Sequence, residues 1–141
     1  MQTSARNQYL GTVTAVKKGA VNAEVTLDIG NGAQLAAIIT NDSADHLALE
    51  VGSEAYALVK AQWIILTVET NFKTSARNSL TGIVVRCQEG AVNAEVVIEL
   101  PGGKTVASII TNESVKVLGL KEGVRATAMI KASHIILAVP A

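Results

Sequence analysis

The sequence is poor in cysteine, proline and aromatic residues, and its charges cancel. Its 141 residues contain one Cys, two Pro and four aromatic residues, while 12 basic and 12 acidic side chains give a net charge of zero. With Cys87 alone, neither a disulfide framework nor a CxxC metal site can form within the chain. A chain without net charge does not attract nucleic acid or anionic membranes through its overall field.

Long hydrophobic runs and targeting signals are also missing. No stretch approaches the roughly 18 consecutive apolar residues of a membrane-spanning helix. The first residues, MQTSARNQYL, lack the basic region and apolar run of a secretory signal peptide. We therefore expect a soluble, cytoplasmic protein.

What the sequence does have is an internal repeat. A shift of 71 residues aligns Thr3 with Thr74 and Val68 with Val139 without a gap, and 32 of the 66 aligned positions are identical. The identities cluster in TSARN, GAVNAEV, IITN-x-S and KA-x-x-IIL, whereas the segments between them differ freely. Recent duplication alone would leave scattered matches, so the clustering favours a shared function. We expect two domains, residues 1–69 and 70–141, with the linker ETNFK at 69–73.

Each repeat is predicted to form β-strands. In residues 20–29, AVNAEVTLDI, apolar and polar residues alternate, which is typical of a strand with one buried face. GNG at 30–32 and PGG at 101–103 supply hairpin turns. Each repeat offers five short strands and one helical turn after the third or fourth of them. This pattern predicts an all-β fold of two tandem OB-like five-stranded barrels.

The strands carry more Ile, Val and Leu than one small barrel can bury. A domain of about 60 residues buries only about 60 % of its unfolded surface and is marginal alone. The segments at 34–40 and 105–111 are apolar on both faces, which indicates burial against other domains or chains. We expect a homo-oligomer.

No catalytic constellation is repeated. His46 aligns with a valine and His134 with a tryptophan, so neither histidine belongs to the shared design. Glu24 and Glu95 do repeat, but they lie on the polar face of a strand, where a solvated or interface role is the simpler interpretation. A GxxxxGK[ST] phosphate loop is absent. We expect a protein that is not an enzyme.

The repeated polar residues are hydrogen-bond donors without accompanying acids, which suit a tetrahedral oxyanion. They are Ser4, Arg6, Thr40, Ser43 and Lys60 in the first repeat, and Ser75, Arg77, Thr111, Ser114 and Lys131 in the second. Some four to six charge-assisted bonds of about 1.5–3 kcal/mol each, less ordering and desolvation, would reach a micromolar Kd. Each residue alone has a simpler explanation; Ser43, for example, could cap the helical turn.

These motifs together resemble the molbindin family, the Mop or TOBE domains that bind molybdate. The resemblance covers nearly the whole chain, and SARN together with GAVNAEV is specific to the family. It implies an OB-like barrel per repeat and assembly of the tandem chains into a trimer, with six oxyanion sites between domains and chains. It also implies a role in molybdenum storage and homeostasis, binding of molybdate with tungstate as an alternative ligand, no cofactor, no direct ligand of a metal cation and no catalysis.

The resemblance also implies which residues bind the anion. They are Ser4, Ala5, Arg6, Thr40, Ser43, Lys60 and Ala61, and Ser75, Ala76, Arg77, Thr111, Ser114, Lys131 and Ala132. Family members often have serine after the lysine, whereas both repeats here have alanine, which offers only its backbone N–H. A second class of sites near the threefold axis would use backbone donors of Gly19, Ala20, Val21 and Asn22, and of Gly90, Ala91, Val92 and Asn93. A Gly-Ala-Val segment is, however, also what a tight strand start needs.

Two other functions stay open. An OB-type nucleic-acid binder would stack bases on aromatic residues along a basic groove, which four aromatic residues and zero net charge do not favour. A molybdate-responsive regulator or sensor generally carries an added DNA-binding or ATPase domain, and the two repeats occupy nearly all of this sequence.

Overall fold

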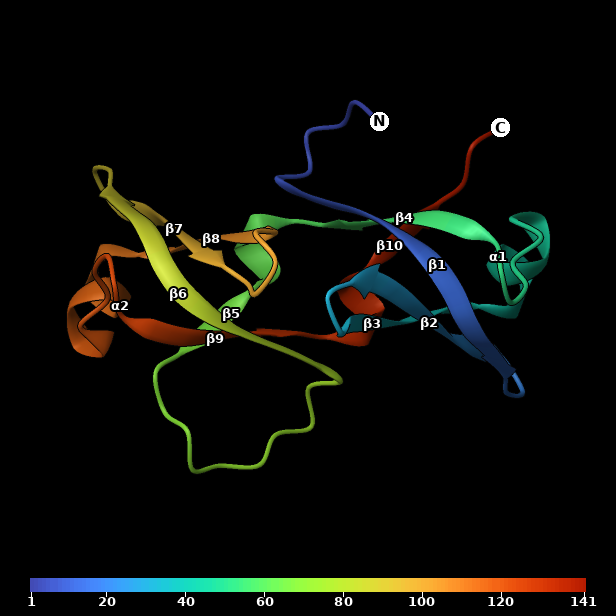
Figure 1. Cartoon of the computed structure of the whole chain (residues 1–141), viewed down its shortest axis with the longest axis horizontal. Coiled ribbons are helices and arrows are strands. Elements are labelled where there is room, and N and C mark those ends of the chain that lie inside the picture. Colours follow the sequence, from blue (N-terminus) through green and yellow to red (C-terminus); the bar gives the residue numbers. More distant parts are fainter.

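The computed structural model describes all 141 residues and consists mainly of β-strands (Figure 1). The first repeat forms β1 (Asn7–Lys18), β2 (Asn22–Gly30), β3 (Ala33–Thr40), β4 (Glu54–Val59) and β5 (Ile65–Thr67). The second forms β6 (Asn78–Glu89), β7 (Asn93–Glu99), β8 (Thr105–Thr111), β9 (Arg125–Ile130) and β10 (Ile136–Ala138). Each third strand is followed by a short helix, α1 (Asn41–His46) or α2 (Asn112–Leu118), and each fourth strand by a 3-10 turn, Ala61–Trp63 or Ala132–His134. The all-β class with one short helix per repeat is confirmed.

The last strand of each repeat lies in the sheet of the other repeat. The two five-stranded sheets have the orders β10-β4-β1-β2-β3 and β5-β9-β6-β7-β8. Leu66 of β5 is paired with Ala128 of β9, and Leu137 of β10 with Ala57 of β4. Only residues 60–64 separate β4 from β5, and their 3-10 turn carries the chain onward to the other sheet (Figure 1). Each five-stranded unit is therefore built from four strands of one repeat and one strand of the other.

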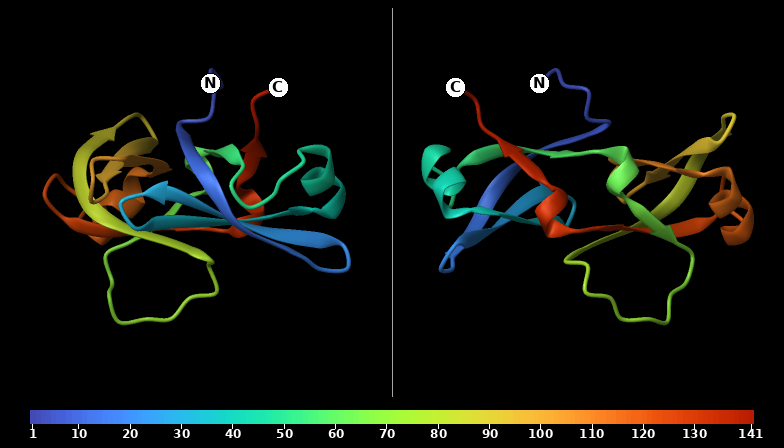
Figure 2. Two further views of the ribbon diagram at one scale, coloured as in Figure 1. Left: turned by 45° about the vertical axis from the view of Figure 1, so that its right-hand side comes forward. Right: turned by 180° about the vertical axis from the view of Figure 1, so that it is seen from behind.

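The two units lie side by side, and the chain termini lie at the edge opposite to the loop that joins the two repeats (Figure 1). Figure 1 shows the N- and C-terminal segments at one edge and the loop between β5 and β6 at the other, and the turned views of Figure 2 agree. The first TSAR segment belongs to the N-terminal stretch, and the second ends the loop that leads into β6. The two copies of TSAR are thus placed on opposite edges of the molecule.

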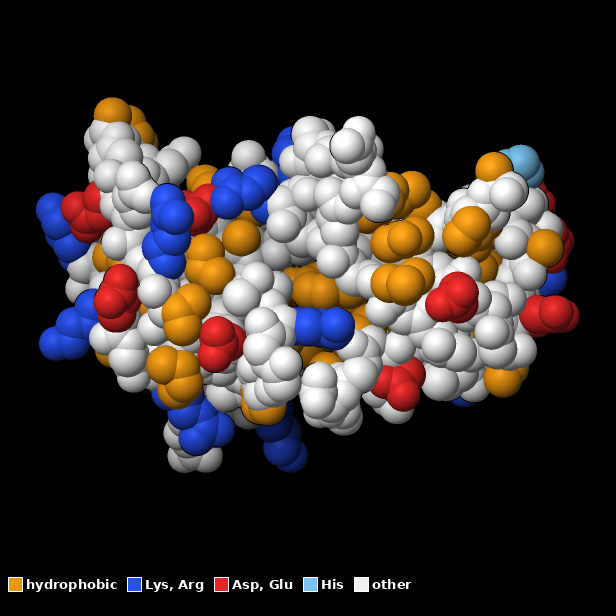
Figure 3. All heavy atoms as spheres, turned by 45° about the horizontal axis from the view of Figure 1, so that its top comes forward, with side chains coloured by type: hydrophobic (Ala, Val, Ile, Leu, Met, Phe, Trp, Pro, Cys, Tyr) orange, Lys and Arg blue, Asp and Glu red, His pale blue; other side chains and the backbone are white.

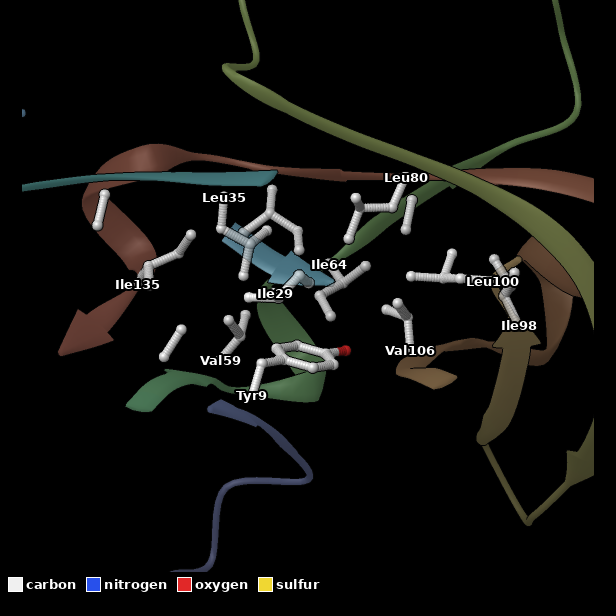
Figure 4. Packing of buried hydrophobic residues seen from close by; sticks show 14 of the residues in the cluster. Tyr9, Ile29, Leu35, Val59, Ile64, Leu80, Ile98, Leu100, Val106 and Ile135 are labelled. Atoms are coloured by element: carbon white, nitrogen blue, oxygen red, sulfur yellow. The ribbon is translucent and has the colours of Figure 1, made fainter. Parts of the chain in front are cut away.

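One continuous core runs through both units. A single cluster of 27 buried residues draws on both repeats. Val25 and Leu27 of β2 are fully buried, as the alternating pattern predicts. Ile64, which follows the first 3-10 turn, is 2 % exposed, and Figure 4 shows it close to Val106 of the other unit. The crossing segments therefore bury apolar side chains in the partner unit as well as pairing with its sheet.

Buried asparagines at the end of each TSARN motif join the two sheets. Asn78 Nδ2 donates to the Ala36 carbonyl at 2.9 Å, and its Oδ1 accepts from the Ala36 N–H at 2.7 Å. Asn7 makes the same two bonds with Ala107, at 2.8 Å and 2.7 Å. Each side chain thus bonds to an edge strand, β3 or β8, as a neighbouring strand would. Part of the repeated pentapeptide is therefore structural.

The two helices are short and begin at threonine caps. Thr40 Oγ1 accepts from the Ser43 N–H at 3.1 Å, and Thr111 Oγ1 accepts from the Ser114 N–H at the same distance. The cap predicted at Ser43 is therefore provided by Thr40, because the residue that ends β3 already lies at the N-cap position. No helix has the length and apolar character needed to cross a membrane.

Candidate functional site

A local turn on the surface presents the residues that precede β1. Thr3 Oγ1 accepts a hydrogen bond from the Ala5 N–H at 3.1 Å, and Thr74 Oγ1 accepts the equivalent bond from the Ala76 N–H at 3.1 Å. A hydroxyl that bonds to a backbone N–H two residues on stabilises a tight turn. The threonine of TSARN thus shapes the segment that carries the predicted ligands.

Strand pairing brings Lys60 next to this turn. β1 and β4 are antiparallel with Asn7 opposite Val59. Arg6, just before β1, and Lys60, just after β4, therefore lie next to each other. A hollow of about 630 Å³ opens there, lined by Thr3, Ser4, Ala5, Arg6, Leu58, Lys60, Ala61, Gln62, Trp63, Ile109 and Ile136. The structure therefore brings together Ser4, Ala5, Arg6, Lys60 and Ala61 of the first predicted set.

The second repeat reproduces this backbone arrangement. Asn78 lies opposite Ile130 in the pairing of β6 with β9, which places Arg77 beside Lys131. Ser75 and Ala76 precede Arg77 in the turn, and Ala132 begins the second 3-10 turn. The predicted ligands at 75–77 and 131–132 are thus gathered as in the first repeat.

Thr40 and Ser43 lie in a different hollow from Arg6. Theirs has a volume of about 370 Å³ and is lined by Ile38, Ile39, Thr40, Ser43, His46, Leu47, Ser133, Ile135, Ile136 and Leu137. The two hydroxyls are hydrogen-bonded to each other at 2.9 Å, as are those of Thr111 and Ser114. Ile136 lines both hollows. A single chain therefore does not unite these hydroxyls with Arg6 and Lys60.

The expectation that the donors lack accompanying acids is wrong for the two arginines. Arg6 forms an ion pair with Glu95, and Arg77 forms one with Glu24. Each pair joins TSARN of one repeat to GAVNAEV of the other. The sequence alone did not indicate these pairs, because their members lie far apart in the chain. The hydrogen bond from Arg77, reinforced by its charge, lowers the pKa of Glu24 below the ordinary value of 4.5, and the same bond raises the pKa of Arg77.

The GAVN segments form tight turns, and each turn is stabilised by hydrogen bonds from an asparagine of the IITN motif. The Gly19 N–H donates to the Asn22 carbonyl at 2.7 Å, and Asn41 binds the turn through its own N–H to Val21 at 2.9 Å and its Nδ2 to Gly19 at 3.0 Å. The N–H groups of Ala20 and Val21 have no partner within the chain. The second repeat has the same bonds at Gly90–Asn93 with Asn112. Each turn therefore displays free backbone donors, and the asparagine of IITN is a residue that sequence reasoning missed.

Trp63 and His134, which occupy equivalent positions of the two repeats, are in contact. Their ring centroids are 4.9 Å apart, and Lys60 Nζ lies 5.7 Å from the centre of the Trp63 ring.

No cluster of three or more His, Cys, Asp or Glu side chains could hold a metal ion. Cys87 is partly buried, and this burial raises the pKa of its thiol.

The fold defines a protein of two tandem β-domains with a repeated set of hydrogen-bond donors, and comparison with known families agrees. The TOBE domain family matches residues 3–66 and again residues 74–137. The chain belongs to this family, with two domains in tandem, and the resemblance to the molbindins is confirmed.

A solved structure shows the same architecture over the full length. The cytoplasmic molybdate-binding protein ModG, solved with molybdate bound, is 51 % identical to this chain and superposes on it with a TM-score of 0.97. The match covers 99 % of this chain and 100 % of the ModG chain. Two curated relatives are similar in sequence. The molybdenum transport protein ModE of Azotobacter vinelandii is 46 % identical over 139 residues, which are 99 % of this chain and 52 % of that protein. The molybdenum-pterin-binding protein MopA of Rhodobacter capsulatus is 46 % identical over 141 residues, 99 % of this chain and 53 % of that protein. The chain spans about half the length of these curated relatives.

Proposed function

We propose that this chain is a cytoplasmic molybdate-binding protein that stores and buffers molybdenum by holding several anions per oligomer. One observation carries the proposal: the pairing of β1 with β4 gathers Arg6, Lys60 and their small neighbours around an open hollow, and β6 with β9 repeats this arrangement. The full-length likeness to ModG, a cytoplasmic molybdate-binding protein, supports molybdate as the ligand.

The chemistry of the donors fits a tetrahedral dianion. Arg6 and Lys60 supply charge-assisted bonds, and the Ser4 hydroxyl supplies a neutral one. Ala61 is the first residue of a 3-10 turn, so its N–H has no partner within the turn and is available to an oxygen. Molybdate and tungstate share charge and shape, so these donors bind both. Sulfate is smaller, and donors set at the longer spacing would form stretched bonds with it.

Complete sites would form between copies of the chain. Thr40 and Ser43 do not share a hollow with Arg6 in one chain, so a neighbouring copy would bring them to it. Ile65 and Ile136, equivalent positions of the two repeats, are 63 % and 57 % exposed. Figure 3 shows hydrophobic side chains gathered on one face among charged ones. A trimer would cover such side chains and hold six of these sites.

A second class of sites would lie at the GAVN turns. The unpartnered N–H groups of Ala20 and Val21, and the equivalent groups of Ala91 and Val92, could converge on an anion around a threefold axis. Val21 is 71 % exposed and Val92 is 70 % exposed, so both turns are open for such an assembly.

The experiment that tests this function is a calorimetric titration of the purified protein with molybdate, repeated in excess sulfate. We expect tight binding of more than one anion per chain, undisturbed by sulfate, and a higher melting temperature, because bound ligand stabilises the folded assembly. Absence of binding would reject the proposal. The proposal also fails for the intersubunit sites if saturating molybdate leaves the melting temperature unchanged.

A regulatory role is the second candidate. It is favoured by 36 % identity over 140 residues to the DNA-binding transcriptional dual regulator ModE of Escherichia coli, because this chain matches about half of that regulator. Light scattering and a pull-down with the loaded and the empty chain separate the two roles. A storage protein shows no partner specific to either form, whereas a sensor shows one.

A further inference from the structure

Each arginine of the proposed sites forms an ion pair with a glutamate from the opposite repeat. Arg77 holds Glu24 with both terminal nitrogens, Nη2 lying 2.7 Å from Oε1 and Nη1 bonded to Oε2. The Glu24 side chain is 28 % exposed and the Arg77 side chain 50 % exposed. The pair is thus two-pronged and lies at the surface, where an anion from solvent can reach the arginine.

The corresponding pair at the other end of the molecule is built differently. Glu95 bonds Arg6 through Oε2, while its Oε1 lies 3.3 Å from Nε of a second arginine, Arg86. The first repeat has no counterpart of Arg86, because Ala15 occupies that position. Lys17 lies opposite Glu24 on β1, but it forms no ion pair with it. Glu95 is therefore shared between two arginines, whereas Glu24 is committed to one.

A carboxylate next to a binding arginine opposes a dianion in two ways. It uses the N–H groups that the anion needs, and it repels the anion when both are near the guanidinium. We propose that Glu24 and Glu95 are built-in counter-ions that compete with the oxyanion for Arg77 and Arg6, and that the Arg6 sites bind more tightly than the Arg77 sites. This inference rests on the proposed function and adds the two residues that set the affinity of its sites.

The inequality follows from what each glutamate loses when the anion enters. If Arg6 turns to the anion, Glu95 keeps Arg86 as a partner and its charge stays compensated. If Arg77 does so, Glu24 loses both of its contacts at once. Displacing Glu24 therefore costs more, and the Arg6 sites fill first as molybdate is added.

The test separates the two sets of sites with lysine variants, since the lysines take no part in the ion pairs. Lys131→Ala should remove the Arg77 sites and leave only the Arg6 sites, and Lys60→Ala should do the reverse. Molybdate binding is measured by calorimetry in each of these two variants. The fluorescence of Trp63, the one tryptophan, gives a second readout because it lines the hollow of Arg6 and Lys60. We expect Kd to be lower for the Arg6 sites.

Neutral variants of the glutamates then test competition directly. Glu95→Gln in the first background and Glu24→Gln in the second should each lower Kd, by about tenfold for Glu24→Gln. Glu99→Gln is the matched control, because Glu99 lies on β7 with Glu95 and forms no ion pair. Kd unchanged or raised in both glutamine variants would overturn the inference, since a glutamate that merely positions the arginine would weaken binding when neutralised. Either variant suffices for this test if the other fails to fold.

Arg86→Ala tests the origin of the inequality. It should raise Kd of the Arg6 sites, because Glu95 would then bind Arg6 alone. Loss of a nearby positive charge could do the same without Glu95, so the substitution is repeated in the Glu95→Gln background. The effect should shrink in that background, and an equal effect in both would overturn the role of Arg86. If the unaltered chain binds no molybdate, the proposed function fails together with this inference. If it binds and the glutamine variants do not bind more tightly, only the inference fails.

Discussion

Asn7 and Asn78 occupy the same place in the two repeats, and each ties the first strand of its own sheet to the edge strand of the other. The bonds of Asn7 reach Ala107, 100 residues further along the chain. Both asparagines are 3 % exposed, so water cannot replace these bonds. The pentapeptide TSARN therefore ends in a residue that holds the two units together, next to residues that face the proposed anion.

Asn7→Ala should destabilise the chain by about 2–4 kcal/mol, because it removes the two buried hydrogen bonds to Ala107 and leaves the Ala107 backbone groups without partners. Urea unfolding of the two proteins measures this difference in free energy. Gln34→Ala, at an exposed position of β3, is the control and should change stability by less than about 0.5 kcal/mol. A loss below about 1 kcal/mol for Asn7→Ala would contradict the structural role of the asparagine.

Arg6→Ala should remove the proposed molybdate sites that use Arg6 and leave the proposed sites that use Arg77. The reason is that the two arginines lie on opposite edges of the chain and belong to separate donor sets. Calorimetry should show roughly half as many anions bound at the arginine sites, with Arg125→Ala as a control outside both sets. Full capacity and unchanged affinity in Arg6→Ala would show that the site is assigned wrongly.

Val92→Asp should weaken the proposed trimer. Val21 and Val92 are equally exposed in the two repeats, and a charge placed where chains meet is costly to bury. Size-exclusion chromatography with light scattering should show a smaller particle for this variant. The control is Val51→Asp, since Val51 is 68 % exposed and aligns with Glu122, which shows that an acid is tolerated there. A trimer that persists in Val92→Asp would place the interface elsewhere.

The ion pair of Glu24 and Arg77 should make stability depend on pH below the ordinary glutamate pKa of 4.5. Since folding lowers the pKa of Glu24, the pair contributes fully above that value and its contribution is lost as pH falls through the lowered pKa. The stability difference between the unaltered chain and Glu24→Gln should therefore shrink between pH 5 and more acidic conditions, as measured by urea unfolding at each pH. A difference that does not change with pH would mean that the carboxylate charge contributes nothing.

Local patterns were sufficient for the strands and the hairpin turns, whereas the grouping of Arg6 with Lys60 was expected only from the family resemblance. Strand alternation marked the buried face of β2 because each side chain's direction depends only on its position in the pleat. The pairing of β1 with β4, which places Arg6 beside Lys60, joins strands that are not consecutive in the chain and is visible only in the fold. Gly11 is repeated for a reason visible only in the fold, since a Cβ there would lie 2.8 Å from the Asp28 carbonyl oxygen.

The all-β class, the tandem repeat and the repeated donor residues could be predicted from the sequence, because these depend on the order of apolar and polar residues within short segments. The exchange of β5 and β10 between the sheets, the bond of Asn7 to Ala107 and the ion pair of Glu95 with Arg6 are visible only in the folded chain. Such contacts join residues far apart in the chain. A strand buries the same face whether it pairs in its own unit or in the other, so its local pattern is identical in both cases and only the packing of the whole chain distinguishes them.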